Sequence, residues 1–474
     1  MPAVATYSPT GTAYINGVLG DMKWAVNSFT YSFPTSGSYY GSNYGSGENV
    51  TQFGALNSAQ QNAVHSAFDM FASVANLSFT YVSETSTQHA DLRFARSDTP
   101  GTAWAYTPAT TGEGGDAWFN NSSGYYNSPA KGNYAYATVL HETGHTLGLE
   151  HAHEHFVMPT AGDSMEYTLM SYRSYVGASL TGYTNETGGY AQSLMMYDIA
   201  GLQHMYRANF ATNSGNTTYS WSQTTGEAFI NGVGQGAPVA NRIFQTIWDG
   251  GGIDTYHFGN YTSNLAIDLR PGHFSVLSSG QLADLGNGHD ARGNVFNALQ
   301  YRGDVRSLIE NAVGGSGNNK MYGNQVANTL SGGGGNDALY GYAGNDRLVG
   351  GAGNDFLVGG TGKDILKGGS GADVFYFNTA LNSSTNVDTI QDFSVPGDTI
   401  RLEDAVFKGL ALGTLAADAF CISSGALDRE DRIIYNKSTG ALSYDADGTG
   451  AAAAIKFAQL TAGLALSRWD FFVV

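Results

Sequence analysis

Apolar and polar residues follow a helical spacing in three parts of the first 210 positions. The clearest lies within residues 64–74, where apolar residues recur at i, i+3, i+4 and i+7 and would form one buried stripe. Ser58 and Gln61 precede this stripe in the pattern of a capping box. The other elements predicted here are a helix after Asn133, a helix at about residues 193–206, and strands at residues 29–33, 77–82 and 90–95. This region therefore predicts an α+β domain with a small sheet packed on helices.

The pattern changes at about residue 210, where helical periodicity ends. Short β-like runs, such as residues 229–233 and 265–269, then alternate with turns of Gly, Asn and Asp. We expect residues 21–210 to form the α+β domain and residues 211–474 to form an all-β domain. Residues 1–20 are small and polar, and we expect an N-terminal arm or pro-segment there.

A nine-residue unit recurs seven times without a gap between residues 314 and 376. Five copies approach Gly-Gly-x-Gly-x-Asp-x-U-x, where U is a large apolar residue, while Asn319 and Asn328 hold the Asp position in the first two. Such units stack as a coil of parallel strands, a β-roll, in which aspartates and main-chain carbonyls can surround Ca²⁺. The expected calcium ligands in the repeats are Asp337, Asp346, Asp355, Asp364 and Asp373, with Gly332, Gly334, Gly341, Gly350, Gly359 and Gly368.

Charge and composition restrict the possible partners. Charged residues make up only 13% of the chain, and the net charge is −18, which argues against nucleic acid and anionic membranes as partners. Ligands for a hard cation would explain the acidic excess. Cys421 is the single cysteine, so no intramolecular disulfide can form. The chain shows neither a standard signal peptide nor an apolar run of about 18 residues. This predicts no membrane span, and it leaves either a cytoplasmic protein or export by a signal elsewhere.

The most specific motif lies at residues 141–151. His141 and His145 are four residues apart on a predicted helix and therefore share one face. Gly148 can end that helix in a left-handed conformation and turn the chain, so that His151 returns toward the first two histidines. Three converging imidazoles make an open zinc site, and Glu142 lies close enough to handle the protons of a bound water. The alternative, an ordinary pair of helical histidines, is disfavoured by the glycine and third histidine at fixed offsets.

A second signal follows in the segment 168–172, where Met170 and Tyr172 lie just beyond turn-compatible residues. Core filling would explain Met170 alone, and the histidine motif before it gives it weight. His153 and His155 are extra to a site that already has three ligands, and we interpret them as loop histidines.

The histidine motif, the methionine turn and the repeats together resemble the serralysins, a family in the metzincin clan of zinc metalloproteases secreted by Gram-negative bacteria. The likeness extends to Ala90-Asp-Leu-Arg-Phe94, Gly115-Asp-Ala-Trp-Phe119, Asp198-Ile-Ala200 and Trp248-Asp-Gly-Gly-Gly-Ile-Asp-Thr255. It implies a metzincin-like α+β catalytic domain followed by an all-β domain, a parallel β-roll with β-sandwich- or jelly-roll-like flanks.

The resemblance also implies roles for particular residues. His141, His145 and His151 would hold one Zn²⁺, and Glu142 would be the general base. Met170 would form a hydrophobic base under the zinc, and Tyr172 would stabilise the oxyanion. Asp249 and Asp254 would be further calcium ligands. An edge strand near residues 115–120 would hold the substrate, with Ala117 and Trp118 as the substrate-binding residues.

We therefore expect a secreted zinc endopeptidase of broad specificity that acts on proteins or peptides as a monomer. Export would use a type I machinery that reads the C-terminus, and a periplasmic proteinaceous inhibitor is a candidate partner. One alternative is a secreted calcium-binding adhesion or surface-layer module with an inactive protease domain. Another is a zinc hydrolase that acts on a non-peptide bond.

Overall fold

The computed structural model describes residues 2–474, which form two compact units. The first unit runs to Gly215 and also takes in Ser222–Gly252 and Ser279–Ser307. The second consists of Asn216–Trp221, Ile253–Ser278 and Leu308–Val474. The chain therefore crosses between units several times after residue 210, where the sequence predicts one boundary. Within residues 2–474, no helix has the length and apolar character needed to cross a membrane.

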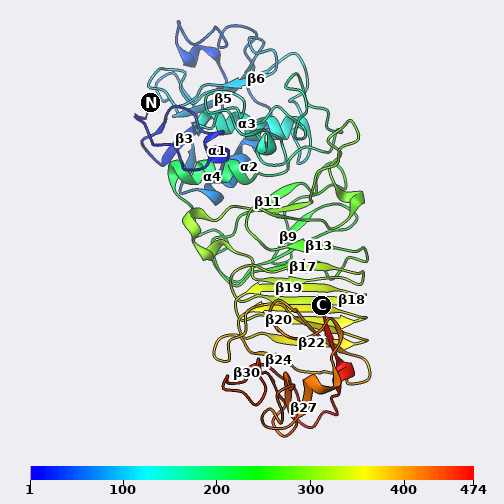
Figure 1. The fold of residues 1–474 in the computed structure, drawn as a ribbon. Helices are drawn as coiled ribbons and strands as arrows, with labels where there is room; N and C mark the ends of the chain where they lie inside the picture. The colour runs from blue at the N-terminus through cyan, green and yellow to red at the C-terminus, as the bar shows by residue number, and fades with distance from the viewer. Residues whose placement is uncertain (1) are drawn as a thin grey trace. The chain divides into compact units, whose positions relative to one another are not determined.

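The first unit contains a five-stranded sheet packed with the helices, which confirms the α+β prediction (Figure 1). The strand order is β4-β3-β5-β7-β6, and all neighbours are parallel except β6 and β7. The sheet strands are β3 (Ser28–Ser32), β4 (Ser78–Tyr81), β5 (Leu92–Ser97), β6 (Ala103–Ala105) and β7 (Ala117–Asn120), and the helices are α1 (Ala13–Asn16), α2 (Ser58–Val74), α3 (Tyr134–Thr146) and α4 (Met196–Tyr206). Shorter strands of this unit are β1 (Val4–Ala5), β2 (Lys23–Trp24), β9 (Ala228–Ile230), β10 (Val233–Gly234), β11 (Gln245–Ile247) and β15 (Val295–Asn297).

Helices α2 and α3 begin at asparagines whose side chains cap them. Asn57 and Gln60 form the capping box of α2, one residue before the pair that the sequence predicts, because the Asn57 side chain accepts the Gln60 amide. The predicted stripe within residues 64–74 is buried. Asn133 caps α3 as predicted, and α4 begins three residues later than expected.

The second half of the predicted N-terminal arm is packed rather than loose. Val18 and Leu19 are buried, and Leu19 forms an antiparallel bridge with Leu149. The Glu150 amide donates to the Val18 carbonyl at 3.0 Å. Because Leu149 and Glu150 lie just before His151, the arm supports the turn that leads to that histidine.

The second unit is built around the predicted β-roll, whose strands stack as parallel sheets (Figure 1). Successive repeats alternate between one sheet in the order β8-β12-β16-β18-β20-β22-β24 and another in the order β13-β17-β19-β21-β23-β25. The strands are β8 (Thr218–Trp221), β12 (Thr255–His257), β13 (Ala266–Asp268), β14 (Phe274–Ser275), β16 (Asn311–Val313), β17 (Lys320–Tyr322), β18 (Thr329–Gly334), β19 (Ala338–Ala343), β20 (Arg347–Ala352), β21 (Phe356–Thr361), β22 (Ile365–Ser370), β23 (Val374–Phe377), β24 (Asp388–Ile390) and β25 (Thr399–Leu402).

Leucines and a phenylalanine at the U positions fill the space between the two sheets. Leu348 pairs with Leu330 and Leu366 on neighbouring strands of the first sheet, and the U residues from Leu339 to Phe375 are at most 1% exposed. The large apolar residues of the repeats therefore form a thin core between the sheets.

Beyond the roll the sheets continue into a mixed flank. β31 lies between β25 and β26, so the C-terminal strand is an inner strand of its sheet. The flanking strands are β26 (Gly413–Thr414), β27 (Phe420–Ile422), β28 (Ile433–Asn436), β29 (Ala441–Tyr444), β30 (Ile455–Gln459) and β31 (Phe471–Val473).

Candidate metal centre and active site

The structure brings the three histidines of the 141–151 motif together. His141 and His145 lie on one face of α3, and Gly148 follows with φ of +100°, so the chain turns as predicted. The Nε2 atoms lie 3.0 Å apart for His141 and His145, 2.9 Å for His145 and His151, and 3.2 Å for His141 and His151. Three ring nitrogens thus share one small space.

Main-chain carbonyls fix which nitrogens face that space. Nδ1 of His141 donates to the Leu169 carbonyl and Nδ1 of His145 donates to the Leu149 carbonyl, both at 2.8 Å. With the proton on Nδ1, each Nε2 presents a lone pair. Burial lowers the pKa of both rings to about 3, and burial first and then the charge of His141 lower the pKa of His151 to about 4, so all three are neutral.

This donor set fits a zinc ion. Neutral imidazole nitrogens bind Zn²⁺ at about 2.0–2.1 Å, and a tetrahedron of that size has edges of about 3.4 Å, close to the observed nitrogen separations. Three lone pairs at such distances repel one another unless a cation lies between them. The residues present therefore match one zinc ion with three protein ligands.

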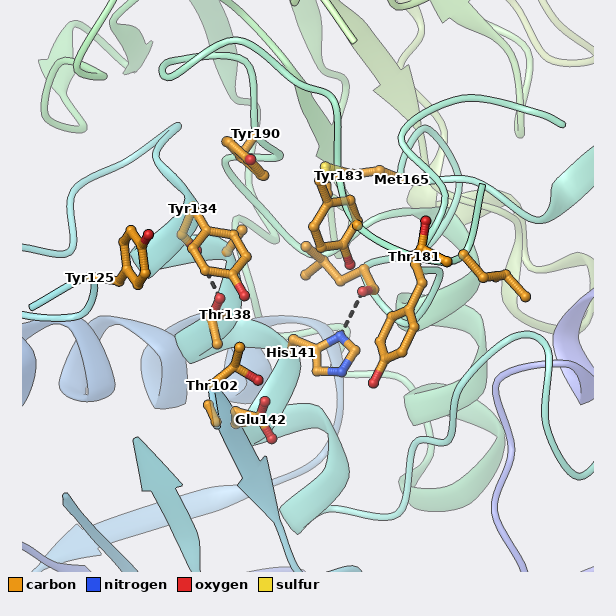
Figure 2. Close-up of a pocket in the computed structure, with 16 residues that line it drawn as sticks. Thr102, Tyr125, Tyr134, Thr138, His141, Glu142, Met165, Thr181, Tyr183 and Tyr190 are labelled. Carbon is orange, nitrogen blue, oxygen red and sulfur yellow. Dashed lines mark hydrogen bonds between the residues drawn. The ribbon is translucent and has the colours of Figure 1, made fainter. Parts of the chain in front are cut away.

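Glu142 follows His141 on α3 and lines the same pocket. Its side chain is buried, and no residue in the described chain, 2–474, hydrogen-bonds its Oε2 atom. Burial raises the pKa of Glu142 to about 8, so the carboxyl can hold a proton near neutral pH. Figure 2 shows the carboxyl near Thr102 at one end of the pocket.

A tight turn places Met170 against Gly144 of α3 and Tyr172 against His151. Met170 is 1% exposed, and a Cβ on Gly144 would come within 3.1 Å of its sulfur, so the glycine allows the methionine to approach α3 closely. The Met170 carbonyl accepts the amide of Ala152, the residue after His151. The Tyr172 hydroxyl lies 2.9 Å from Nε2 of His151.

Asp198 of α4 binds the start of this turn, at residues 168 and 169. It is fully buried, and its carboxylate accepts the amides of Leu169 and Met195, each at 2.9 Å, and the hydroxyl of Thr168. Since the Leu169 carbonyl in turn accepts from His141, the carboxylate is two hydrogen bonds from a predicted metal ligand. The sequence shows only an isolated acid in an apolar helix, which signals a buried acid but not its partners.

A pocket of about 530 Å³ opens beside His141 and Glu142 (Figure 2). Tyr134, Tyr183 and Tyr190 lie close to one another in its wall, with ring centroids 5.6–6.2 Å apart. Most of the remaining wall is apolar or hydroxyl-bearing, and it is completed by Thr102, Ala103, Tyr125, Ala137, Thr138, Met165, Leu169, Tyr172, Leu180, Thr181 and Gly182. The pocket can take a large uncharged side chain.

Comparison with known proteins agrees with this geometry. Residues 49–169 match the model of the Matrixin family, and residues 208–428 match the model described as Peptidase M10 serralysin C terminal. The chain is 32% identical over 314 residues to Metallopeptidase AprA of Pseudomonas marginalis and 32% identical over 327 residues to Serralysin of Proteus mirabilis. Both parts of the chain are therefore similar to proteins of the serralysin family. Both alignments cover 64% of this chain, and they span 61% and 60% of the two relatives' own length.

The serralysin-type site differs from the sequence prediction at the substrate-binding strand. Ala117 and Trp118 are completely buried, because β7 lies between β5 and β6 rather than at the edge. The prediction that these two residues line the substrate groove is therefore wrong. The strand at this edge of the sheet is β6. Its first residue, Ala103, and the residue before it, Thr102, line the pocket together with Glu142.

The extra histidines after the third ligand lie in a loop, as predicted. His153 packs against the Tyr172 ring, with centroids 4.9 Å apart, and His155 lies 2.9 Å from the carboxylate of Asp21. Glu154 lies 3.1 Å from Nδ1 of His151, and this carboxylate is a partner that the sequence reading missed.

The repeat aspartates face the inside of the turns. Asp337, Asp346, Asp355, Asp364 and Asp373 are 1–2% exposed, and in each the Oδ2 atom has no hydrogen-bond partner in the part of the chain that the structure describes. Burial raises the pKa of every one of them, to about 7 for Asp337 and Asp346. The Oδ2 atoms lie beside the expected glycines Gly332, Gly341, Gly350, Gly359 and Gly368, whereas the amide of Gly334 donates to Gly315.

The two aspartates expected to bind calcium before the repeats fall in different units. Asp249 accepts the Gly251 amide, and Asp254 accepts the Thr217 amide, both at 2.7 Å. Both side chains are at most 1% exposed. Their role as calcium ligands stays a prediction.

Proposed function

We propose that this chain is a zinc-dependent endopeptidase that hydrolyses peptide bonds in extended segments of proteins. The observation that carries the proposal is the convergence of the Nε2 atoms of His141, His145 and His151 beside the carboxyl of Glu142. The Matrixin match over residues 49–169, which contain all four side chains, supports it, as do relatives whose names include metalloprotease.

The three histidines would hold one zinc ion. Bound in such a site, zinc lowers the pKa of a water molecule to about 7 and polarises a carbonyl. The carbonyls of Leu169 and Leu149 keep two of the imidazoles in the required tautomer and orientation.

Glu142 and Tyr172 are the side chains placed to act on the peptide. As the oxygen of water bonds to the carbonyl carbon and the C–N bond breaks, Glu142 takes the proton that the water loses and gives it to the leaving amine. Its burial and raised pKa suit both steps. The Tyr172 hydroxyl, at 2.9 Å from His151, is close enough to donate a hydrogen bond to the carbonyl oxygen as negative charge develops there.

Strand β6 offers a main-chain edge for the substrate. The Thr102 carbonyl accepts from Asn120 and the Tyr106 amide donates to Asp116, so the groups that alternate with these, on Ala103 and Ala105, point away from β7. A peptide could add to this edge as a further strand. Main-chain recognition predicts cleavage of many sequences, while the pocket favours a large uncharged side chain.

The β-roll would bind several calcium ions through its aspartates. Buried carboxylate oxygens beside main-chain carbonyls support this role, since like charges at such sites require a cation. Secretion from a Gram-negative cell by a type I machinery, action as a monomer and control by a periplasmic inhibitor remain expectations from the family resemblance.

Casein digestion by the full chain, prepared with zinc and calcium, tests the proposal. The unaltered chain should cleave casein, and a zinc chelator should stop it. Glu142→Gln should lower the rate by about 10²–10⁴-fold while one zinc stays bound, as measured by native mass spectrometry. Glu430→Gln, an exposed glutamate, is the matched control and should cleave normally.

The other outcomes of this assay separate the alternatives. A zinc-loaded chain that cleaves no protein would favour the calcium-binding module with an inactive protease domain. Hydrolysis of esters or amides without hydrolysis of proteins would favour the non-peptide hydrolase. Full activity of Glu142→Gln would exclude the proposed role of that carboxyl.

A further inference from the structure

Side chains at the Asp position of the repeats form two ladders along the β-roll, with a spacing of 18 residues. The first ladder is Asn319, Asp337, Asp355 and Asp373, and the second is Asn328, Asp346 and Asp364. The Oδ1 atom of each aspartate accepts the main-chain N–H of the residue one rung earlier, at 2.7–2.9 Å. This contact is the same whether the earlier rung is Asn or Asp.

The second carboxylate oxygen, Oδ2, has no donor within residues 2–474 and instead faces another acceptor. A Cβ on Gly332 would lie 2.2 Å from Oδ2 of Asp337 and 2.7 Å from the carbonyl oxygen of Gly350, so both oxygens lie on the same side of that glycine. The corresponding atoms one turn later are Oδ2 of Asp355 and the carbonyl oxygen of Gly368, beside Gly350. A buried carboxylate and a carbonyl cannot satisfy each other, and a cation can satisfy both.

Asn319 occupies the same position one turn earlier and needs no cation. A Cβ on Gly314 would lie 2.4 Å from the Gly332 carbonyl oxygen and 2.9 Å from Nδ2 of Asn319. Here the side-chain amide donates directly to that carbonyl, at 2.9 Å, and Oδ1 accepts the Leu265 amide at 3.1 Å. The Asn319 N–H group therefore satisfies the Gly332 carbonyl, whereas the Gly350 carbonyl would need a cation.

Asn328, at the start of the second ladder, is held by direct hydrogen bonds, but its Oδ1 rather than its Nδ2 lies beside the Gly341 carbonyl oxygen at Gly323. Its Nδ2 donates to the Glu310 carbonyl and to Oδ1 of Asn324, both at 3.0 Å, and its own Oδ1 accepts the Asn324 amide at 2.7 Å. Asn324 in turn donates to the Ile309 carbonyl at 2.8 Å. Asn319, Asn324 and Asn328 are each 2% exposed, so these amides replace water.

We propose that Asn319 closes the first turn of the β-roll without a cation, so that residues 308–331 stay folded when calcium is removed. As calcium binds, the aspartate turns then add to β16 in one sheet and to β17 in the other. In stacked repeats stability is set by each unit and its neighbour, and a folded end unit gives the next one a surface on which to form. This inference rests on the calcium binding proposed above.

Hydrogen exchange of the full chain, measured by mass spectrometry with calcium and after calcium chelation, tests the inference. Amides of β16 and β17 should keep their protection within about threefold, while those of β20 to β22 should lose at least about 100-fold. Loss of protection across all of these strands would overturn this inference and leave calcium binding intact. Unchanged protection everywhere would overturn the calcium proposal and this inference with it.

Exchanging the two side chains gives a sharper test. Asn319→Asp should lower the hydrogen-exchange protection of the β17 amides without calcium by at least about tenfold, because the new carboxylate is a buried acceptor with no donor. Added calcium should restore this protection. Asn318→Asp is the matched control, because this exposed neighbour adds the same charge and keeps the oxygen that accepts the Asn336 amide. The control should leave β17 unchanged.

The reverse variant decides the matter if Asn319→Asp does not fold. Asp337→Asn supplies an amide opposite the Gly350 carbonyl and should extend calcium-free protection to β19. Protection that stops at the same residue as in the unaltered chain would overturn the inference, as would identical behaviour of Asn319→Asp and Asn318→Asp.

Discussion

The carbonyl of Leu169 accepts a 2.8 Å hydrogen bond from Nδ1 of His141, and the amide of the same residue donates to Asp198 at 2.9 Å. The main chain of one residue, Leu169, therefore links helix α4 to a predicted metal ligand on α3. Because the histidine and the aspartate are buried, water cannot replace these contacts. The orientation of His141 thus depends on a carboxylate that touches neither the metal nor the substrate.

Asp198→Ala should weaken zinc binding and stability together. The change leaves the amides of Leu169 and Met195 unpaired, at a cost of about 1–3 kcal/mol for each buried group. We expect zinc affinity to fall by about 10–100-fold, measured by competition with a chromogenic chelator. Asp69→Ala, on the exposed face of α2, is the control. Unchanged zinc affinity in Asp198→Ala would show that Leu169 is held without it.

Gly148→Ala should destabilise the turn between the second and third histidines. Gly148 has φ of +100°, and an added Cβ would lie 2.8 Å from the Met22 carbonyl oxygen. A left-handed alanine costs about 1–2 kcal/mol before that contact is counted. We expect a lower melting temperature and faster zinc loss than in Gly112→Ala, where the added Cβ meets nothing within 4 Å. Equal melting temperatures would contradict the turn's role.

Tyr172→Phe should slow hydrolysis without releasing zinc. The ring would keep its packing against His153, while the hydroxyl near His151 would be lost. Removal of a hydrogen-bond donor to a developing oxyanion lowers kcat by about 10²–10³-fold. Steady-state kinetics on a quenched peptide should show this fall with little change in KM. Tyr81→Phe, at an exposed site on β4, is the control and should keep the kcat of the unaltered chain. An unchanged kcat in Tyr172→Phe would show that its hydroxyl plays no part.

Ala105→Pro should impair binding of extended substrates at β6. Proline removes an N–H group that points away from β7, and edge strands tolerate proline, so the fold should survive. We expect kcat/KM for peptides of eight or so residues to fall by at least about tenfold, the effect of losing a hydrogen bond of about 1.4 kcal/mol. Ala105→Gly keeps the N–H group and serves as the control. Equal kcat/KM for the two variants would place the substrate elsewhere.

Local spacing made the metal centre and the β-roll predictable. Four residues on a helix bring His141 and His145 to one face, and a glycine three residues later redirects the chain to His151. A repeat of fixed length likewise sets the register of parallel strands, so the core leucines and the buried aspartates could be named from the sequence.

Contacts between distant parts of the chain could not be predicted in this way. The runs at residues 103–105 and 117–120 look alike in sequence, and only their pairing in the sheet shows that the first is the edge and that Trp118 is buried. Asp198 and Leu169 are 29 residues apart, and Tyr134 and Tyr190 meet in the pocket from separate segments. No local pattern encodes such partners.

Peptide hydrolysis measured as a function of added zinc tests the central claim most directly. The full chain, stripped of zinc and kept in calcium, would be titrated with zinc while cleavage of a quenched peptide is followed. The account predicts a rate that rises linearly and stops rising at one zinc per chain, with His151→Ala inactive at that ratio. Hydrolysis at full rate without zinc, or none at any zinc concentration, would contradict it.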